Sequence, residues 1–290
     1  MSRRPEPVDA LLWYSARLYA RAYGRFKDRT GRNLKGLGFV LRRLQGDREF
    51  EAGGFRWFFD HRIASAYMRL VGGGFNEPET HAFLRYVADC APQPVTFVDV
   101  GANIGELVVA LAAHAHVGTV IAFEPHPVCS AVCRRNVALN HLSADVRGLL
   151  IADGAPQPYL VDTNYAPTSG IRRDTHVSAL TPSHRLDDVL EVDGDCILLV
   201  DVEGAELDVL KGACALVQQV RPLIVFEYSS LIQRGLFTLA DVLRVVGPDY
   251  ELFRLRADGY LDSRLADTWN CVAVHQASMF APICRARLKR

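Results

Sequence analysis

The sequence lacks the features of a secreted or membrane-spanning protein. Its cysteines are odd in number and scattered, and no C-x-x-C pair occurs among Cys90, Cys129, Cys133, Cys196, Cys214, Cys271 and Cys284. This pattern argues against a disulfide framework and a zinc site, and for a reducing compartment. No apolar run reaches the roughly 18–20 residues of a transmembrane helix. Arg17 and Arg21 interrupt the stretch where a signal peptide would be apolar. We therefore expect a cytoplasmic protein.

Lysine is scarce, and charge is unevenly distributed. Four of the 33 basic residues are lysines, which is typical of a GC-rich bacterial genome. Residues 1–70 carry 15 Lys and Arg against 7 Asp and Glu, which leaves 18 against 26 for the remaining residues. A basic arm thus precedes an acidic body, and the two should attract each other. An acidic body gives little support for a nucleic-acid groove.

The N-terminal region predicts an arm followed by a hairpin. Apolar residues between Leu11 and Phe26 recur at helical spacing, with Arg17, Arg21 and Arg25 on another face, and a second helix is expected at 34–44. We expect residues 1–47 to dock on the body or to form a homodimer contact. A peripheral membrane or anionic-glycan contact through the arginine face is the alternative. Residues 48–94 predict a hairpin around Gly53 and Gly54 and helices at 61–71 and 77–90.

Residues 95–280 alternate short apolar strands with helices, which is typical of a Rossmann-like α/β fold. The predicted sheet is mostly parallel and has seven strands, the last two forming a late antiparallel hairpin. We expect the strands at 95–100, 119–123, 145–151, 196–201, 222–227, 250–256 and 270–275. We expect the helices at 105–114, 127–140, 204–217 and 238–246, and a basic tail at 281–290.

A glycine-containing turn follows the first of these strands. Asp99 lies in the strand, Gly101 begins the turn, and Gly105 opens the next helix. Ligands of open α/β sheets bind at the carboxyl ends of strands, and free N–H groups at a helix N-terminus suit an anion such as a methionine carboxylate. The dinucleotide motif G-x-G-x-x-G requires glycine where Asn103 and Glu106 stand. The turn therefore disfavours a pyrophosphate.

Carboxylates end the neighbouring strands. Glu124, followed by Pro125, lies 19 residues beyond Gly105, where an acidic side chain can accept both ribose hydroxyls. That position alone does not separate NAD from S-adenosylmethionine, and a Glu-Pro pair can also simply begin a helix. Asp201 and Glu227 end two further strands and should face the same crevice.

Together these motifs resemble the FkbM-family methyltransferases. The resemblance spans about residues 72–275 and rests on five segments: V-D-V-G-A-N-I-G, F-E-P, L-D-D at 186–188, D-V-E-G-A-E at 201–206 and P-L-I-V-F-E at 222–227. It implies a class I methyltransferase sheet, S-adenosylmethionine as cofactor, and O-methylation of a hydroxyl on a sugar, a glycan or a related natural product.

The resemblance also implies a cofactor site. Its methionine end would be lined by Asp99, Gly101, Ala102, Asn103 and Gly105. The ribose would be held by Glu124 with Pro125, and the adenine flanked by Ala152 and Asp153. The sequence departs from the family pattern at His126 and Arg185, and both changes bear on the acceptor pocket.

For the reaction itself, we expect Asp201 to act as base or to orient the acceptor, with Glu203 and Glu227 in support. His176, in the loop 163–185, is a rival, and His126 and Tyr228 are further candidates for contacting the acceptor. The carboxylates could instead hold Mg²⁺, an alternative that the sequence does not favour. An NAD-type oxidoreductase and a non-catalytic scaffold with the same fold remain the competing functions.

Overall fold

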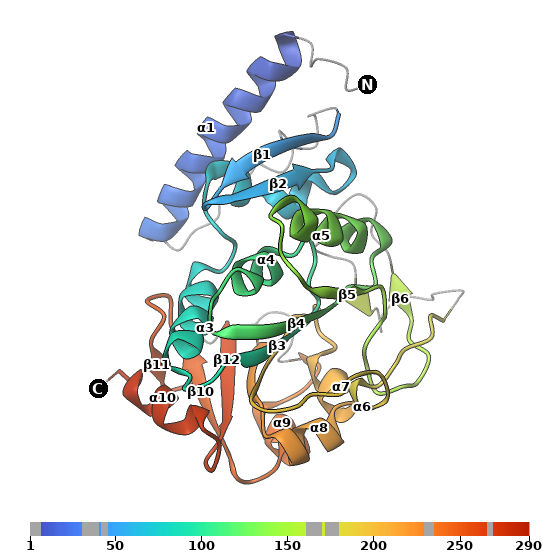
Figure 1. Cartoon of the computed structure of the whole chain (residues 1–290), viewed down its shortest axis with the longest axis vertical. Helices are drawn as coiled ribbons and strands as arrows, with labels where there is room; N and C mark the ends of the chain where they lie inside the picture. Colours follow the sequence, from blue (N-terminus) through green and yellow to red (C-terminus); the bar gives the residue numbers. More distant parts are fainter. Residues whose placement is uncertain are drawn as a thin grey trace.

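The centre of the molecule is an eight-stranded sheet (Figure 1). The computed structural model describes residues 7–30, 41, 46–160, 170–171, 180–228, 235–265 and 269–289. From one edge to the other the strand order is β11-β10-β12-β9-β8-β3-β4-β5. The strands are β3 (Val95–Val100), β4 (Val117–Phe123), β5 (Asp145–Arg147), β8 (Cys196–Val200), β9 (Leu223–Glu227), β10 (Tyr250–Leu255), β11 (Leu261–Asp262) and β12 (Asn270–His275).

The predicted mostly parallel sheet with a late antiparallel hairpin is confirmed. Strands β5, β4, β3, β8 and β9 are parallel, and β12 runs antiparallel to both of its neighbours, β9 and β10. The two-residue β11 extends the sheet from seven strands to eight. The strand expected at 145–151 is shorter, because β5 ends at Arg147 and Ile151 instead forms a bridge with His184.

Helices cover both faces of the sheet, so its central strands are buried on each side. Within β3, Phe97 belongs to one hydrophobic core while Val98 and Val100 belong to the other. On the first face lie α3 (Pro78–Cys90), α4 (Glu106–Ala112), α5 (Pro127–Leu139) and α10 (Phe280–Ala286). On the second face lie α6 (Leu186–Val189), α7 (Glu206–Lys211), α8 (Cys214–Val220) and α9 (Leu239–Val246).

Three segments differ from the sequence-based expectation. The helix expected at 204–217 is divided into α7 and α8 around Gly212, which lies so close to the Ala152 carbonyl that a Cβ there would come within 2.0 Å of its oxygen. The helix expected at 61–71 consists of two 3₁₀ turns, η1 (His61–Tyr67) and η2 (Leu70–Gly72). The segment expected as a basic tail includes most of α10, in which Ala281 and Cys284 are buried.

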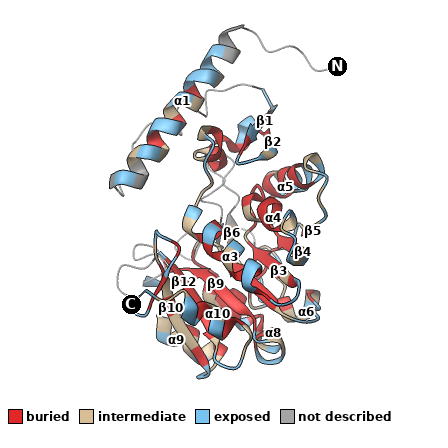
Figure 2. Ribbon diagram, turned by 60° about the vertical axis from the view of Figure 1, so that its left-hand side comes forward, coloured by how far each residue is buried: buried red, intermediate tan, exposed pale blue. Residues whose placement is uncertain are grey.

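The N-terminal helix α1 (Pro7–Thr30) lies against the hairpin of β1 (Arg48–Ala52) and β2 (Phe55–Phe59) and against η2 (Figures 1 and 2). Its buried side chains are Ala16, Ala20 and Tyr23. Trp13 meets the rings of Phe50 and Phe59 edge-on at 5.4 and 5.2 Å. The hairpin is held to α5, because the Asn136 side chain accepts from the Phe58 N–H at 2.8 Å.

The second helix expected at 34–44 falls almost entirely outside the described residues. Strands β6 (Tyr159–Leu160) and β7 (Gly170–Ile171) form a separate short pair. Among the described helices, none combines the length and apolarity needed to cross a bilayer.

The contact between α1 and η2 depends on Gly72 having no side chain. A Cβ on Gly72 would come within 2.8 Å of the Ala20 backbone, whereas one on Gly74 would meet nothing within 4 Å. We predict that Gly72→Ala lowers the free energy of unfolding by about 1–3 kcal/mol, because α1 must shift away. Gly74→Ala, the matched control, should be neutral or slightly stabilising. Denaturant titration measures both, and equal effects would show that α1 does not press on Gly72.

Candidate functional site

A cleft opens at the carboxyl ends of the central strands. In the sheet register Val100, the last residue of β3, pairs with Phe123 of β4 and with Val200 of β8, so the turns after all three strands are adjacent. The cleft encloses about 510 Å³, part of it open to solvent. Its lining residues are Asn76, Glu77, His81, Asp99, Gly101, Ala102, Asn103, Ile104, Glu106, Leu107, Leu199 and Asp201.

The turn after β3 is shaped by backbone contacts. Gly101 has φ 98°, donates its N–H to the Phe123 carbonyl at 2.9 Å, and lies against the loop after β8. A Cβ on Gly101 would come 1.8 Å from the Asp201 carbonyl oxygen. The close approach that requires glycine here is therefore to the protein's own backbone, where the sequence suggested a ligand. Asn103 has a left-handed φ of 50°, a conformation that asparagine tolerates better than most residues.

Glu124 joins the turn after β3 to the turn after β4. One carboxylate oxygen accepts from the Asn103 N–H and the other from the His126 N–H, both at 2.7 Å. Burial raises the pKa of Glu124 to about 7, although these two hydrogen bonds oppose the rise. The predicted ribose carboxylate is thus built into the turn that carries the predicted methionine-binding residues.

Two carboxyl groups face the cleft from neighbouring strands. Asp99 is buried in β3, and burial, followed by the charges of Glu124 and Glu77, raises its pKa to about 8. Burial also raises the pKa of Asp201 well above its usual value, and the carboxylates of Glu77, Glu227, Glu203 and Glu206 raise it further. The cleft therefore concentrates carboxyl groups in a poorly hydrated place that favours their neutral forms, and a cation entering it would favour their ionised forms.

The sequence analysis missed the cleft residues that precede the sheet. Glu77 has a left-handed φ of 48°, immediately before α3 begins at Pro78, and its carboxylate accepts from the Asn270 amide at 2.7 Å. Glu106 is buried and accepts from the Asn76 backbone and side chain at 2.8 and 2.6 Å. The sequence predicted the helix that begins here, at 77–90, but no local pattern shows that its start lies beside the turn after β3.

His81 was also missed, and it presents an unsatisfied nitrogen. Its ring is buried and stacks on Phe75 with the ring centroids 4.3 Å apart. Burial lowers the pKa of His81 to about 3, so the imidazole is neutral. Within the described chain, neither Nδ1 of His81 nor Oδ1 of Asn103 has a hydrogen-bond partner. Both residues line the cleft, so a ligand could satisfy these atoms.

Four residues predicted for the cofactor site are not among those that line this cleft: Gly105, Pro125, Ala152 and Asp153. Gly105 has φ 83° and lies against Cys133, and Pro125 follows Glu124 in the turn that leads to α5. Ala152 donates its N–H to the His184 carbonyl, and Asp153 accepts from the Ala155 N–H at 3.1 Å. All lie within or beside the turns after β3, β4 and β5.

Of the residues predicted to act in catalysis or to contact the acceptor, some lie near Asp201 and others do not. Glu203 has a left-handed φ of 55°, and Glu227 is buried at the end of β9; both are close enough to Asp201 to raise its pKa. His126 caps α5, since its Nδ1 accepts from the Val128 and Cys129 N–H groups. Tyr228 is buried against Phe237 with its ring centroid 5.4 Å away. His176 lies outside the described residues.

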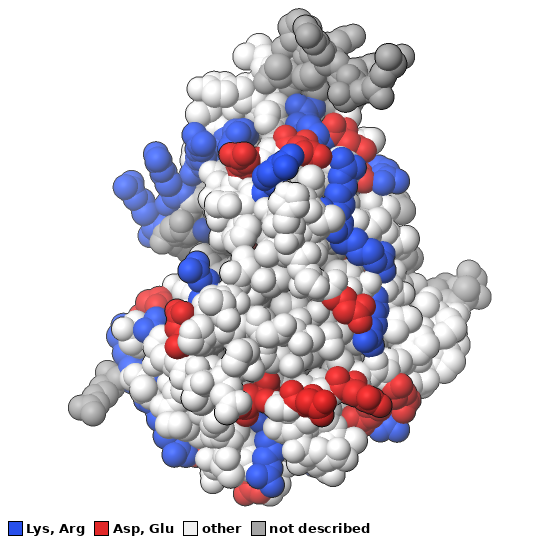
Figure 3. Space-filling model, in the orientation of Figure 1, with Lys and Arg blue, Asp and Glu red and all other residues white. Residues whose placement is uncertain are grey.

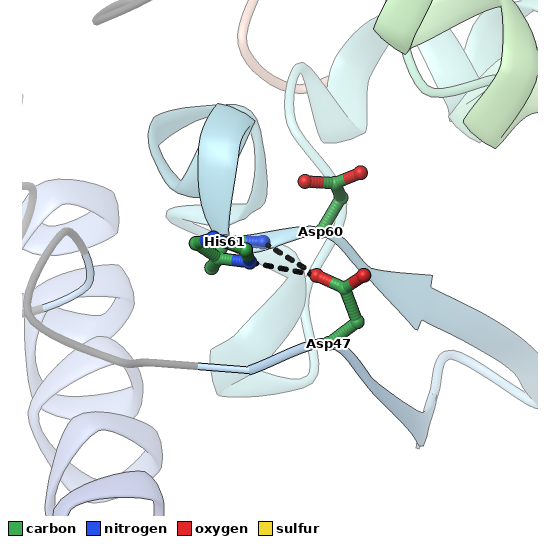
Figure 4. A group of neighbouring side chains, drawn as sticks. All are labelled: Asp47, Asp60 and His61. Atoms are coloured by element: carbon green, nitrogen blue, oxygen red, sulfur yellow. Dashed lines mark hydrogen bonds and ion pairs between the residues drawn. The ribbon is translucent and has the colours of Figure 1, made fainter.

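In the described residues, the donor atoms of one cluster lie close enough together for a metal ion, and that cluster is not in the cleft. Asp47, Asp60 and His61 bring their donor atoms within 4.8 Å of one another (Figure 4). These groups already have protein partners. His61 Nδ1 lies 2.8 Å from the Asp47 carboxylate, and Asp60 forms an ion pair with Arg62 and caps η1. Ion pairing and helix capping account for the cluster.

Comparison with known proteins identifies the family. The Methyltransferase FkbM domain matches residues 99–255, which is more than half of the chain. "Methyltransferase 1" of Beauveria bassiana is 30% identical over 159 residues, covering 45% of this chain and 64% of that protein. The match therefore spans less than two thirds of the relative's length.

Solved structures resemble this chain at lower sequence identity. The FkbM methyltransferase from Methylobacillus flagellatus KT is 16% identical, with a TM-score of 0.43, over 74% of this chain and 53% of that one. TYW2 of M. jannaschii, solved in complex with AdoMet, is 13% identical, with a TM-score of 0.41, over 84% of this chain and 88% of that one. The assignment rests on the family match, which begins at Asp99 and includes the turn after β3, Glu124, Asp201 and Glu227: the chain belongs to the FkbM methyltransferase family.

Proposed function

We propose that the protein transfers a methyl group from S-adenosylmethionine to a hydroxyl oxygen of a sugar, a glycan or a related natural product. The observation that carries this proposal is the acidic cleft at the ends of β3 and β8, which is joined through Glu124 to the turn after β3. The family match supports the methyl transfer. The hydroxyl acceptor follows from the FkbM resemblance, and the carboxylates near Asp201 suit an acceptor that must lose a proton.

The cleft residues fit S-adenosylmethionine. This cofactor carries a sulfonium and an ammonium group. Asp99 and Asp201 offer carboxyl groups whose pKa values are raised by burial and by neighbouring carboxylates, so a cation would favour their ionised forms. Asn103 Oδ1 and His81 Nδ1 offer further polar atoms. Each Glu124 oxygen accepts one backbone N–H and keeps a lone pair for a ribose hydroxyl. Gly101, Ala102 and Gly105 would shape the methionine end, Pro125 would stand beside the ribose, and Ala152 and Asp153 would flank the adenine.

The chain's main task in this reaction is alignment. Bound S-adenosylmethionine supplies an activated methyl group. Holding the two reactants in line is worth about 7–11 kcal/mol, whereas a general base contributes about 10²–10⁴-fold, or roughly 3–5 kcal/mol. The rigid turns after β3, β4 and β8 therefore matter more to the rate than any one proton acceptor.

Asp201 is our candidate for that proton acceptor. A base works best when its pKa is near the working pH, and burial among carboxylates moves the pKa of Asp201 upward in that direction. Glu203 and Glu227 would support it by keeping its proton affinity high. His126 and Tyr228 remain predictions as acceptor contacts, as does His176.

An NAD-type oxidoreductase fits the site less well. The second glycine of its motif is replaced by Asn103, whose backbone N–H is already bonded to Glu124. The third is replaced by Glu106, a buried acid bonded to Asn76. The Glu106 carboxylate, beside the turn, would repel a pyrophosphate.

The raised pKa values predict how cofactor affinity depends on pH. A cationic cofactor favours ionised carboxylates, so binding should release protons from Asp99 and Glu124, whose pKa values are about 8 and 7. We predict that S-adenosylmethionine binds several-fold more tightly at about pH 8.5 than at about pH 6.5. Calorimetry in buffers of different ionisation enthalpy measures both the affinity and the proton release.

Asp99→Asn provides the comparison for this measurement, since it removes one titrating group from the cleft. The variant should bind more weakly and with a flatter pH dependence. Affinity that is constant or falls as the pH rises in the unaltered protein would show that these carboxylates do not face the cofactor.

The role of Asp201 is tested by removing its charge. We predict that Asp201→Asn lowers kcat by about 10²–10⁴-fold, while S-adenosylmethionine affinity changes by only a few-fold. The assay follows transfer of a labelled methyl group to a panel of sugar and polyketide hydroxyls. Asp188→Asn, which alters an exposed carboxylate of α6, is the control. Near-normal turnover of Asp201→Asn with cofactor binding intact would exclude a catalytic role.

A further inference from the structure

Helix α1 has a second apolar face that nothing in the described chain covers. Its buried side chains, Ala16, Ala20 and Tyr23, already contact the body. Four large apolar side chains of α1 nevertheless remain exposed, among them Leu12 at 42%. The other three lie on one face: Leu11 is 67%, Tyr14 61% and Leu18 47% exposed. Exposed apolar residues that gather on one helix face mark an interaction site more often than isolated ones do.

The same face becomes basic toward the C-terminal half of α1. At 3.6 residues per turn, Leu11, Tyr14, Leu18, Arg21 and Arg25 fall within an arc of about 80°, on the side opposite the buried residues. Arg21 and Arg25 are both exposed. We call these five residues the outer face of α1.

A basic groove adjoins the outer face. Arg21 and Arg25 line it from α1, and Arg69 with the glycine run 72–74 lines it from the body. It encloses about 690 Å³, much of it open to solvent, and its lining includes no acidic side chain. Figure 3 shows Lys and Arg side chains projecting outward on the side where Figure 1 places α1, whereas acidic side chains form a band across the opposite part of the body.

From this arrangement we propose that the outer face of α1 and the adjoining groove dock on an anionic phospholipid surface. Leu11, Tyr14 and Leu18 enter the boundary between headgroups and acyl chains, and the arginines contact lipid phosphates. The charge distribution favours one orientation. The arm is attracted to the surface, while residues 71–290, with 18 basic against 26 acidic residues, are repelled by it.

The charge pattern argues against a second copy of the chain as the occupant. In a symmetric dimer each residue meets its counterpart according to the two-fold axis. A parallel pair of α1 helices would place Arg21 and Arg25 against the same arginines. An antiparallel pair could place Leu11 against Leu18, but the five residues of the outer face include no acid that could pair with Arg21 or Arg25. An anionic surface matches both the apolar and the basic part of this face.

Vesicle co-sedimentation of the full chain tests the proposal without reference to catalysis. We expect the protein to pellet with phosphatidylcholine vesicles that contain about 30 mol% phosphatidylglycerol, and to stay in solution with phosphatidylcholine alone. Raising the salt from about 50 mM to about 500 mM should weaken the binding. Leu11→Gln with Leu18→Gln, or Arg21→Gln with Arg25→Gln, should lower the partition coefficient about tenfold or more.

Matched variants separate this surface from general stickiness. Leu180→Gln with Leu236→Gln changes two other exposed leucines, and Arg244→Gln with Arg264→Gln removes two exposed arginines of the body. Both pairs should pellet like the unaltered protein, and unchanged thermal unfolding should show that all variants fold. The proposal fails if the protein does not pellet with anionic vesicles, or if the matched variants lose binding equally. It also fails if light scattering shows a dimer that Leu11→Gln with Leu18→Gln dissociates.

Discussion

The cleft depends on the close approach of two backbone segments, the turn after β3 and the loop after β8. Gly101 permits it, because the Asp201 carbonyl oxygen occupies almost the place where a Cβ would lie. The Asp201 N–H donates to the Val100 carbonyl at 2.9 Å and holds the two segments in register. Glu124 then ties the far side of the same turn to the end of β4. The ends of three strands thus form one rigid edge on which the side chains of the cleft are displayed.

That edge concentrates carboxyl groups. Asp99 lies next to the last residue of β3, and Glu227 ends β9. Glu124 and Asp201 directly follow β4 and β8, and Glu77 reaches the same region from the start of α3. Burial raises the pKa values of Asp99, Glu124 and Asp201, which costs stability, as is expected of a site prepared for a cationic ligand. Apolar side chains at this edge would pack more favourably, but they could not stabilise the positive charge of a sulfonium.

The parts of this site that follow from local sequence were predictable. The apolar run into Gly101, the acidic residue Glu124 and the strand end at Asp201 are each short patterns, and parallel pairing necessarily brings strand ends together. The contributions of Glu77 and His81 were not predictable, because they depend on where α3 packs. The capping role of His126 also depends on the orientation of its ring, which sequence does not encode locally. The break at Gly212 arises from a contact with Ala152, distant in the chain, so periodicity alone predicted one continuous helix.

The central claim is that this cleft binds an S-adenosyl cofactor. Isothermal titration of the purified protein with S-adenosylhomocysteine, and separately with NAD⁺, tests it most directly. We expect saturable binding of S-adenosylhomocysteine alone, and loss of that binding when Gly101→Val and Glu124→Ala are combined in a chain that still folds. Binding of NAD⁺ would contradict it in favour of an oxidoreductase, and binding of neither would indicate a scaffold that retains the fold without the cofactor.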